Sequence, residues 1–392
     1  MLTPLGLSRS FGFGDRLGLA TPGHIAAVKG TPFAPIFAQQ SVRENARTGR
    51  TPAQVLADAR RAVEAAGWDA PWGADADHLK TVDDLPAFVQ AGYTFYTVDP
   101  GQYVDNAADT DALSGLQEKA ARLNWDEISA IYLVSHADNR IGEFTPESLL
   151  RALVKYGRAI LHAAAMYRRL SDMLEAFDFE ISVDETDSPT SPLEHYFIAS
   201  ELTRLGVRFT SLAPRFTGRF EKGVDYIGDL LVLDAEMAKH AAVSAHFGTY
   251  KLSLHSGSDK FSVYPLLRKH WGDRIHVKTA GTSYLEALRT LAVSEPPLFK
   301  RIWTLARQRY ETDRLTYHVS AEPALVRAGL GMPALLEDFH AREILHVTFG
   351  SALAEFGPGI KTALVRHSNL YNANLQKHFR RHLDLLMGNS DG

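Results

Sequence analysis

Five short apolar runs in this sequence end in ionisable side chains or lead directly into them. They are Tyr132–Asp138, Glu180–Thr186, Thr249–Phe261, Ile275–Thr279 and Thr316–Ser320. In the third run Lys251, Ser253 and His255 occupy alternate positions, so a strand would place all three on one face. A buried strand has no structural need for polar groups on one face, because burying them costs free energy. We therefore predict that several strands deliver chemical groups to one site.

The residue types favour a divalent metal site. Such a site needs nitrogen and oxygen ligands from separate segments, with coordination positions left open for substrate oxygens. His136, Asp184 and His255 meet this need. We predict that His276 and His318 lie beside them, as further ligands or in contact with substrate. Taken singly, each histidine could also be an ordinary hydrogen-bonded residue at the edge of a sheet.

A general acid or base and an anion-binding group complete the predicted site. Glu185 follows Asp184 and could turn over the end of its strand to transfer protons, with Lys251 as an alternative because burial lowers the pKa of a lysine. Arg215, Lys260 and Lys278 could hold an anionic substrate. The competing interpretations are a solvated acidic loop around Glu185 and a stiff surface loop around Arg215.

The elements that would position these groups alternate between short β-like runs and longer amphipathic helices. Eight runs read as strands: Leu17–Ala20, Tyr93–Val98, Ala130–Ser135, Phe179–Asp184, Val207–Ala213, Thr249–His255, Arg274–Thr279 and Leu315–Ser320. Eight βα units with polar groups at the strand ends predict a (β/α)8 TIM-like barrel with long rim loops. A doubly wound sheet is the alternative. We expect one barrel domain over residues 1–392, with 333–392 as a mostly helical C-terminal extension.

Composition narrows the class of protein. The chain has 392 residues, of which 45% are hydrophobic and 22% are charged, and a net charge of -4. These values fit a globular enzyme and favour neither nucleic acid nor a membrane as partner. There is no cysteine, so a metal would need histidine and carboxylate ligands, and we expect a cytoplasmic location. The Gly12–Gly18 run departs from the dinucleotide fingerprint, and neither the phosphate-binding Gly-Lys-Ser/Thr pattern nor Gly-x-Ser-x-Gly occurs.

Several longer runs resemble the tagaturonate epimerase family. They are Ser182–Thr186, Ser211–Gly218, Tyr250–Phe261, His276–Tyr284 and the later His346–Gly350. The resemblance implies a barrel enzyme of hexuronate breakdown that interconverts the ketouronates tagaturonate and fructuronate with the help of a divalent metal ion. It does not distinguish zinc, manganese, nickel or cobalt.

The implied reaction restricts the mechanism. The two ketouronates carry the ketone at carbon 2 and differ in configuration at carbon 4, one carbon too far for the ketone to acidify the C–H bond. Either the bond between carbons 3 and 4 breaks and re-forms in a retro-aldol and aldol sequence, or a nicotinamide transiently oxidises carbon 4. Without a dinucleotide fingerprint we favour the first route.

Two other functions stay open at this point. One is a glycoside hydrolase barrel that uses carboxylates such as Glu185 and Glu322. The other is a uronate-binding protein without catalytic activity. The sequence does not predict the oligomeric state.

Overall fold

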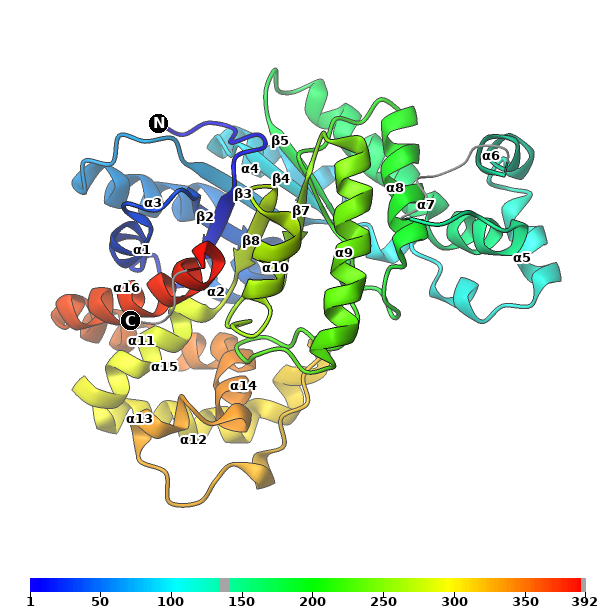
Figure 1. Cartoon of the computed structure of the whole chain (residues 1–392). Helices are drawn as coiled ribbons and strands as arrows, with labels where there is room; N and C mark the ends of the chain where they lie inside the picture. The colour runs from blue at the N-terminus through cyan, green and yellow to red at the C-terminus, as the bar shows by residue number, and fades with distance from the viewer. Residues whose placement is uncertain (134–140, 389–392) are drawn as a thin grey trace.

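A closed ring of eight parallel strands forms the centre of the computed structural model, which describes residues 1–133 and 141–388 (Figure 1). In chain order the strands are β1 Ser10–Gly14, β2 Ala34–Ser41, β3 Gly73–Leu79, β4 Phe95–Val98, β5 Asp178–Ser182, β6 Ser211–Ala213, β7 Lys251–Leu254 and β8 Ile275–Thr279. Each strand pairs with the next, and β8 pairs with β1 to close the ring. The predicted (β/α)8 barrel is confirmed.

Helices surround the ring and extend beyond it. The helices between strands are α1 Thr21–Val28, α2 Val42–Thr48, α3 Pro52–Ala65, α4 Leu85–Ala91, α5 Leu113–Ala120, α6 Trp125–Tyr132, α7 Pro146–Ser171, α8 Pro192–Arg204, α9 Leu230–Phe247 and α10 Tyr264–Trp271. After β8 come α11 Thr282–Ser294, α12 Pro296–Asp313, α13 Met332–Leu335, α14 Phe339–Val347, α15 Phe349–Arg366 and α16 Ser368–Met387, which confirm the predicted helical C-terminal segment. Short 3-10 helices lie at Val82–Asp84, Gly101–Tyr103, Asn106–Asp109, Arg314–Thr316 and Pro323–Leu325. No described helix combines the length and apolarity that crossing a lipid bilayer requires.

The predicted number of strands is right, but three of the eight predicted strands are wrong, and β1, β2 and β3 are not among the eight. Leu17–Ala20 lies in the connection after β1, and Leu315–Ser320 holds the end of a 3-10 helix and an irregular segment. Most of Ala130–Ser135 belongs to helix α6 or its C-cap, and its last two residues lie outside the described residues. Ile128 and Tyr132 are buried four positions apart, which is the spacing of one helix face.

Strand β3 was missed because its sequence, Gly-Ala-Asp-Ala-Asp-His-Leu, is poor in the β-branched and aromatic residues that usually mark strands. Its Asp75 and Asp77 nevertheless alternate, and both are buried inside the ring. Their charges are balanced by groups from other strands, and these partners cannot be read from the local sequence.

The N-terminal end of the ring is closed by the first residues of the chain. Leu5 packs with Ile36 and Phe95 in a small apolar cluster. The backbone N–H groups of Leu5 and Gly6 donate to the carboxylate of Asp178, at the start of β5. With this end sealed, a substrate can approach only from the C-terminal ends of the strands, where barrel enzymes carry their sites.

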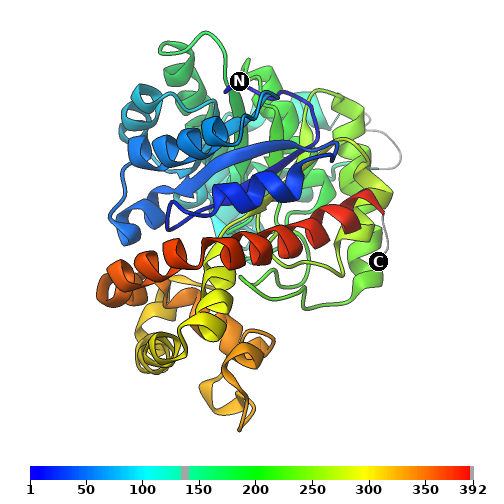
Figure 2. The ribbon, with the colours of Figure 1, turned by 90° about the vertical axis from the view of Figure 1, so that its left-hand side faces the viewer.

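The C-terminal helix α16 runs beside α1 across the outside of the ring (Figures 1 and 2). The two helices approach closely because Gly23 has no side chain: a Cβ there would lie 2.5 Å from the Cβ of Leu375. The close approach of α1 and α16 fixes the position of α16 relative to the barrel.

Gly23→Ala should therefore lower the free energy of unfolding by about 1–3 kcal/mol, because the added methyl group pushes α16 away from α1. Gly115→Ala in α5 is the matched control, since a Cβ at that position meets no atom within 4 Å. The control should be neutral or gain up to about 1 kcal/mol from better helix propensity. Equal effects of the two changes in denaturant unfolding would contradict the packing argument.

Candidate active site

Charged side chains fill the C-terminal half of the ring. Strand β3 contributes Asp75, Asp77 and His78, β5 contributes Glu180, the end of β7 contributes His255, and β8 contributes Lys278; all six are buried. A buried charge needs a partner of opposite sign, so these groups must be considered together.

Lys278 is the central cation. Its Nζ lies 2.6 Å from Asp75, 2.9 Å from Asp77 and 3.0 Å from Glu180. Burial alone would lower the pKa of Lys278, but the three carboxylates outweigh it and raise the pKa. Burial, together with the other carboxylates, raises the pKa of Asp75 to about 7 in spite of Lys278. The lysine thus holds three acidic strand residues together in the barrel interior.

Above Lys278, one carboxylate and two imidazoles converge. His255 Nε2 lies 3.1 Å from His78 Nδ1 and 3.1 Å from Asp77 Oδ1, and His78 Nδ1 lies 3.1 Å from Asp77 Oδ2. Burial would raise the pKa of Asp77, but Lys278 and the two histidines hold it well below its usual range. Donor separations near 3.1 Å resemble those of a tetrahedral metal shell, in which bonds of about 2.0 Å place ligands about 3.3 Å apart.

Each imidazole has a second carboxylate behind it. His255 Nδ1 lies 3.4 Å from Glu180, and His78 Nε2 lies 3.5 Å from Glu185. A carboxylate on the far nitrogen orients a ligating histidine and makes its other nitrogen more basic. A divalent cation therefore fits between Asp77, His78 and His255 for two reasons. Their donor atoms are suitably spaced, and a carboxylate orients each imidazole.

His78 reaches this cluster through an irregularity in its strand. Strict alternation would direct His78 away from Asp77, but its φ of 54° lies in the left-handed region, and the β3–β4 register shifts between Ala76 and Leu79. A non-glycine residue in that conformation costs roughly 1–2 kcal/mol. The contacts of the imidazole with Asp77 and Glu185 offset that cost.

A cavity of about 250 Å³ opens above the cluster. Its walls include the β6–α9 connection and the segment that follows α12. The predicted site residues that line it are Asp184, Glu185, Arg215, His255 and His318. Arg43, Lys222 and Tyr317 also line it. A smaller recess is lined by Asp77, His78 and His255 and shares His255, Arg43 and Lys222 with this cavity, so the cluster adjoins the cavity.

Glu185 is the carboxylate most open to this cavity. Its Oε1 lies 3.5 Å from Arg43 and 3.5 Å from His78, and a third of its side chain is exposed. Burial would raise its pKa, but His78 and Arg43 lower the pKa well below the usual range, so the group is ionised at neutral pH. Its neighbour Asp184 accepts a hydrogen bond of 2.5 Å from the Ser182 hydroxyl.

The chain is similar in sequence and in structure to known epimerases. The profile of the tagaturonate epimerase family matches residues 3–386. The chain is 45% identical to the tagaturonate/fructuronate epimerase of Thermotoga maritima, over 98% of this chain and 82% of that protein. The chain belongs to the tagaturonate epimerase family. It is therefore an isomerase that acts on carbohydrates.

Solved structures agree with this assignment. Two crystal structures of a fructuronate-tagaturonate epimerase from Cohnella laeviribosi, one native and one with glycerol bound, each superpose with a TM-score of 0.94 at 38% identity. They cover 99% of this chain and 83% of the Cohnella chain. A probable tagatose 6-phosphate kinase from Sinorhizobium meliloti, 12% identical with a TM-score of 0.52, shares the fold alone.

Four cations or histidines predicted for the site of this epimerase lie outside the cavity lining. Lys251 donates to Ser8 O and Ser10 Oγ near the N-terminal end of the ring, and burial lowers its pKa to about 8. His276 lies in the same layer, 2.9 Å from the Ser10 hydroxyl. Both share the inward face of their strands, but they lie below the level of Lys278.

Lys260 and Lys278 are also committed to protein partners. Lys260 Nζ donates to the backbone oxygens of Glu221, Val224 and Ser258, at 2.6 to 2.8 Å. Lys278 is enclosed by carboxylates, so its charge is already neutralised. The predicted metal ligand His136 lies outside the described residues.

Sequence reasoning missed Asp75, Asp77 and His78 of the enzyme and gave Glu180 no role. A signal was present, since Asp75 and Asp77 alternate like Lys251 and Ser253 do. The run was not recognised because aspartates are rare in strands.

Proposed function

We propose that the chain interconverts D-tagaturonate and D-fructuronate by a metal-dependent retro-aldol and aldol sequence. The observation that carries this proposal is the convergence of Asp77, His78 and His255 in a recess that adjoins a cavity lined by Glu185 and Arg215. The 45% identity to the Thermotoga maritima epimerase supports the choice of substrates.

In this scheme Asp77, His78 and His255 hold the cation. When bound there, a divalent cation supplies Lewis-acid stabilisation for the negative charge that develops on the ketone oxygen. The donor set differs from the His136, Asp184 and His255 set expected from the sequence. Only His255 is common to the two sets, while Asp184 faces the same cavity and remains available to a substrate hydroxyl.

Glu185 transfers the proton of the reaction. As the bond between carbons 3 and 4 breaks, its electron pair moves toward carbon 3 and the ketone, and Glu185 accepts the proton of the carbon-4 hydroxyl, which becomes an aldehyde. The aldehyde fragment turns to present its other face, carbon 3 attacks it, and Glu185 returns the proton. The result is inversion at carbon 4 without exchange of any carbon-bound hydrogen.

Arg215 holds the substrate carboxylate. No carboxylate of the described residues pairs with its guanidinium, and the group lies half-buried in the cavity wall. Arg219 also lines the cavity, but it is 56% exposed and lies 3.4 Å from Glu221. A partly desolvated guanidinium binds a carboxylate in two parallel hydrogen bonds, which favours Arg215.

Arg215→Ala should raise KM for a ketouronate by about 10- to 100-fold, which corresponds to the roughly 1.5–3 kcal/mol of a charge-assisted hydrogen bond. Arg219→Ala, the matched control from the same loop, should change KM by less than about threefold because it removes an exposed pair. Steady-state kinetics with fructuronate compares the two. A larger effect for Arg219 would assign the carboxylate to that residue instead.

The proposed function is tested by incubating the pure protein with fructuronate in deuterated water and separating the products by chromatography. We expect tagaturonate without carbon-bound deuterium, loss of turnover after treatment with a chelator, and recovery on adding zinc, manganese, nickel or cobalt. Full turnover in rigorously metal-free protein would overturn the metal-dependent scheme. Release of sugar from a glycoside would indicate a hydrolase. Binding of fructuronate without formation of any product would indicate a uronate-binding protein without catalytic activity.

A further inference from the structure

The loop Ser256–Lys260, which directly follows His255, is held by the C-terminal helix rather than by the barrel alone. Its residue Asp259 has a φ of 59°, in the left-handed region that side chains other than glycine rarely adopt. Such a conformation persists only where the surroundings fix it. The groups around Asp259 are therefore the ones that determine the shape of the loop.

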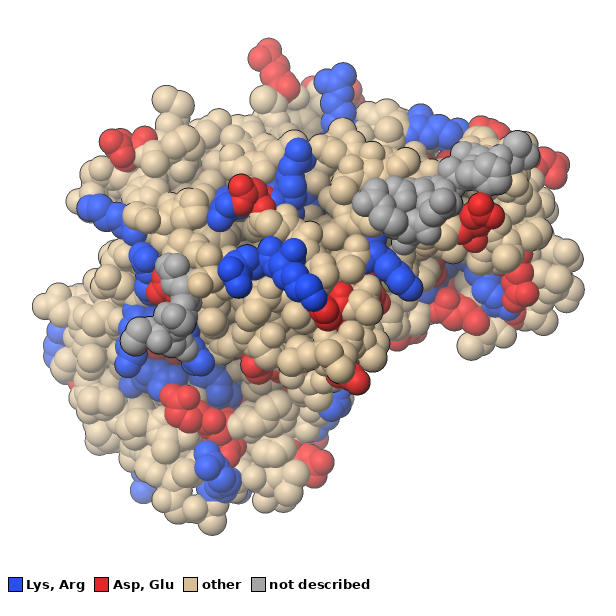
Figure 3. Space-filling view, viewed as in Figure 1, with Lys and Arg blue, Asp and Glu red and all other residues tan. Residues whose placement is uncertain are grey.

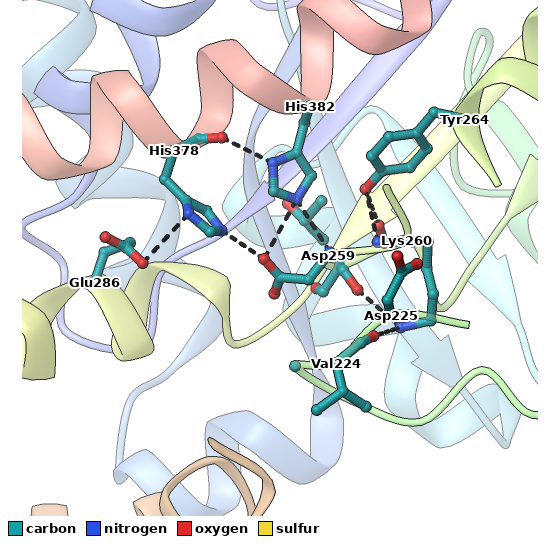
Figure 4. Close-up of polar contacts among 12 residues, drawn as sticks. Val224, Asp225, Asp259, Lys260, Tyr264, Glu286, His378 and His382 are labelled. Atoms are coloured by element: carbon teal, nitrogen blue, oxygen red, sulfur yellow. Dashed lines mark hydrogen bonds and ion pairs between the residues drawn. The ribbon is translucent and has the colours of Figure 1, made fainter. Parts of the chain in front are cut away.

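Three side chains from the C-terminal part of the chain hold Asp259, and Figure 4 shows two of them, His378 and His382. His378 on α16 lies 2.5 Å from one carboxylate oxygen, and Arg342 on α14 lies 3.2 Å from the other. The backbone N–H of Asp259 donates to His382 Nε2 at 3.1 Å. The carboxylate and the backbone N–H of this buried residue are thus both bound to helices that follow the barrel in the sequence.

His378 itself bridges two carboxylates. Its Nδ1 lies 3.5 Å from Glu286 on α11, on the side opposite Asp259 (Figure 4). Burial alone would lower the pKa of His378, but Glu286 and Asp259 outweigh it and raise the pKa. The imidazolium form therefore joins the loop to two helices at once.

Asp259, His378 and His382 could be mistaken for a second metal site, because their donor atoms lie close together. The nitrogen lone pair of His382 that faces Asp259 already accepts the backbone hydrogen bond. The carboxylates of Asp259 and Glu286 are balanced by His378, Arg342 and Arg289, so the cluster needs no further positive charge. Its role is to hold the loop in place.

The same loop reaches the cavity wall. Lys260 binds the backbone oxygens of Glu221 and Val224, on either side of Lys222 in the sequence. Lys222 lines the cavity and donates to the Ser256 hydroxyl at 3.0 Å. A change in the loop would therefore move both the residue after His255 and a cation in the cavity wall.

We propose that His378 is a positioning residue of the epimerase: through Asp259 it fixes the Ser256–Lys260 loop and so places His255 and Lys222. This inference rests on the proposed function for the role of His255, but not on the presence of a metal. It makes α16 part of the catalytic apparatus, although none of the cavity-lining residues comes from that helix.

The surroundings of His378 permit a direct test. A groove of about 800 Å³ lies beside it, lined by Lys377, Arg380 and Arg381 among other residues. In Figure 3, Lys and Arg side chains gather around the C-terminal end of the chain. Because this groove opens to solvent, free imidazole can enter the space that a truncated His378 would leave.

We expect His378→Ala to lower kcat about 10- to 100-fold while KM for fructuronate changes less than about threefold. The reason is that the displacement of a catalytic group by about 1 Å can lower the rate by that factor. Added imidazole should restore kcat at least threefold in this variant and not in the wild type. His378→Gln, which keeps a donor for Asp259, should retain more activity. His367→Ala is the control, because His367 pairs with Glu295 on the outer helices and touches neither Asp259 nor Glu286.

The outcomes separate the two proposals. A wild type that produces no tagaturonate contradicts the proposed function itself, whereas an active wild type with an equally active His378→Ala variant overturns only the positioning role. If the alanine variant fails to fold, His378→Gln decides: a kcat that falls at a temperature where this variant is fully folded supports the positioning role, whereas a lowered melting temperature with wild-type kcat would show a purely structural residue.

Discussion

Lys278→Met should abolish epimerisation and lower the free energy of unfolding by about 3–5 kcal/mol, the cost of removing one partner from a buried ionic cluster. The methionine fills a similar volume, so the effect is electrostatic. Without the ammonium group, Asp75, Asp77 and Glu180 would repel one another inside the ring. Asp77 would then leave the position in which it meets His78 and His255, and kcat should fall more than about 100-fold.

Lys251→Met is the matched control, because it removes a second buried lysine from the neighbouring strand. Lys251 contacts a backbone oxygen and a hydroxyl group, near the closed end of the barrel. Its loss should cost about 1–3 kcal/mol and leave kcat within about tenfold of the wild type. Denaturant unfolding and steady-state kinetics measure both variants. A larger loss of activity for Lys251→Met would restore the catalytic role that its place in the sequence suggested.

Lys251 also gives this comparison a pH dependence. Burial lowers its pKa from 10.5 to about 8, so between these values the unfolded chain binds a proton at Lys251 that the folded chain does not. Stability rises with pH wherever the unfolded state binds more protons. The free energy of unfolding of the wild type should therefore increase relative to Lys251→Met from pH 8 to about pH 10. A constant difference over this range would contradict the lowered pKa.

The second large effect is expected at Glu185. Glu185→Gln keeps the size of the side chain but removes its capacity to accept a proton, so kcat should fall by about 10²- to 10⁴-fold, the usual contribution of a general acid or base. KM should change little, because the amide still fills the same part of the cavity. The kinetic constants for fructuronate measure this directly.

Asp187→Asn tests whether the effect belongs to Glu185 rather than to the acidic run as a whole. Asp187 lies two residues further on, is exposed and does not line the cavity, so its replacement should leave kcat within about twofold. If Glu185→Gln retained wild-type kcat, proton transfer would have to be assigned to another group of the cavity.

The barrel could be predicted from the sequence because its signals are repeated. Strands such as Ile275–Thr279 are apolar and β-branched, and their polar groups lie at alternate positions. Strand β3 could not be predicted, because its aspartates are stable there only through Lys278 and His255, which come from distant strands. The opposite error occurred at α6, where an apolar run has strand-like composition but helical spacing.

Only part of the candidate site could be predicted from the sequence, and the reason is physical. Strand alternation shows which side chains face inward, but not their height along the barrel axis. It therefore selected His255, at the cavity, and Lys251, near the closed end, on equal grounds. His78 turns inward through a left-handed backbone conformation that its sequence does not signal. The three partners of Lys260 lie in loops whose paths depend on the complete fold.

The proposed mechanism requires a divalent cation that is held by Asp77, His78 and His255. Anomalous diffraction at the absorption edge of the metal that restores turnover, recorded from crystals of the reconstituted enzyme, tests it most directly. We expect a peak about 2.0–2.2 Å from His78 Nδ1, His255 Nε2 and a carboxylate oxygen of Asp77, and no peak between Asp259 and His378. A peak at another group of residues, with none among these three, would contradict it.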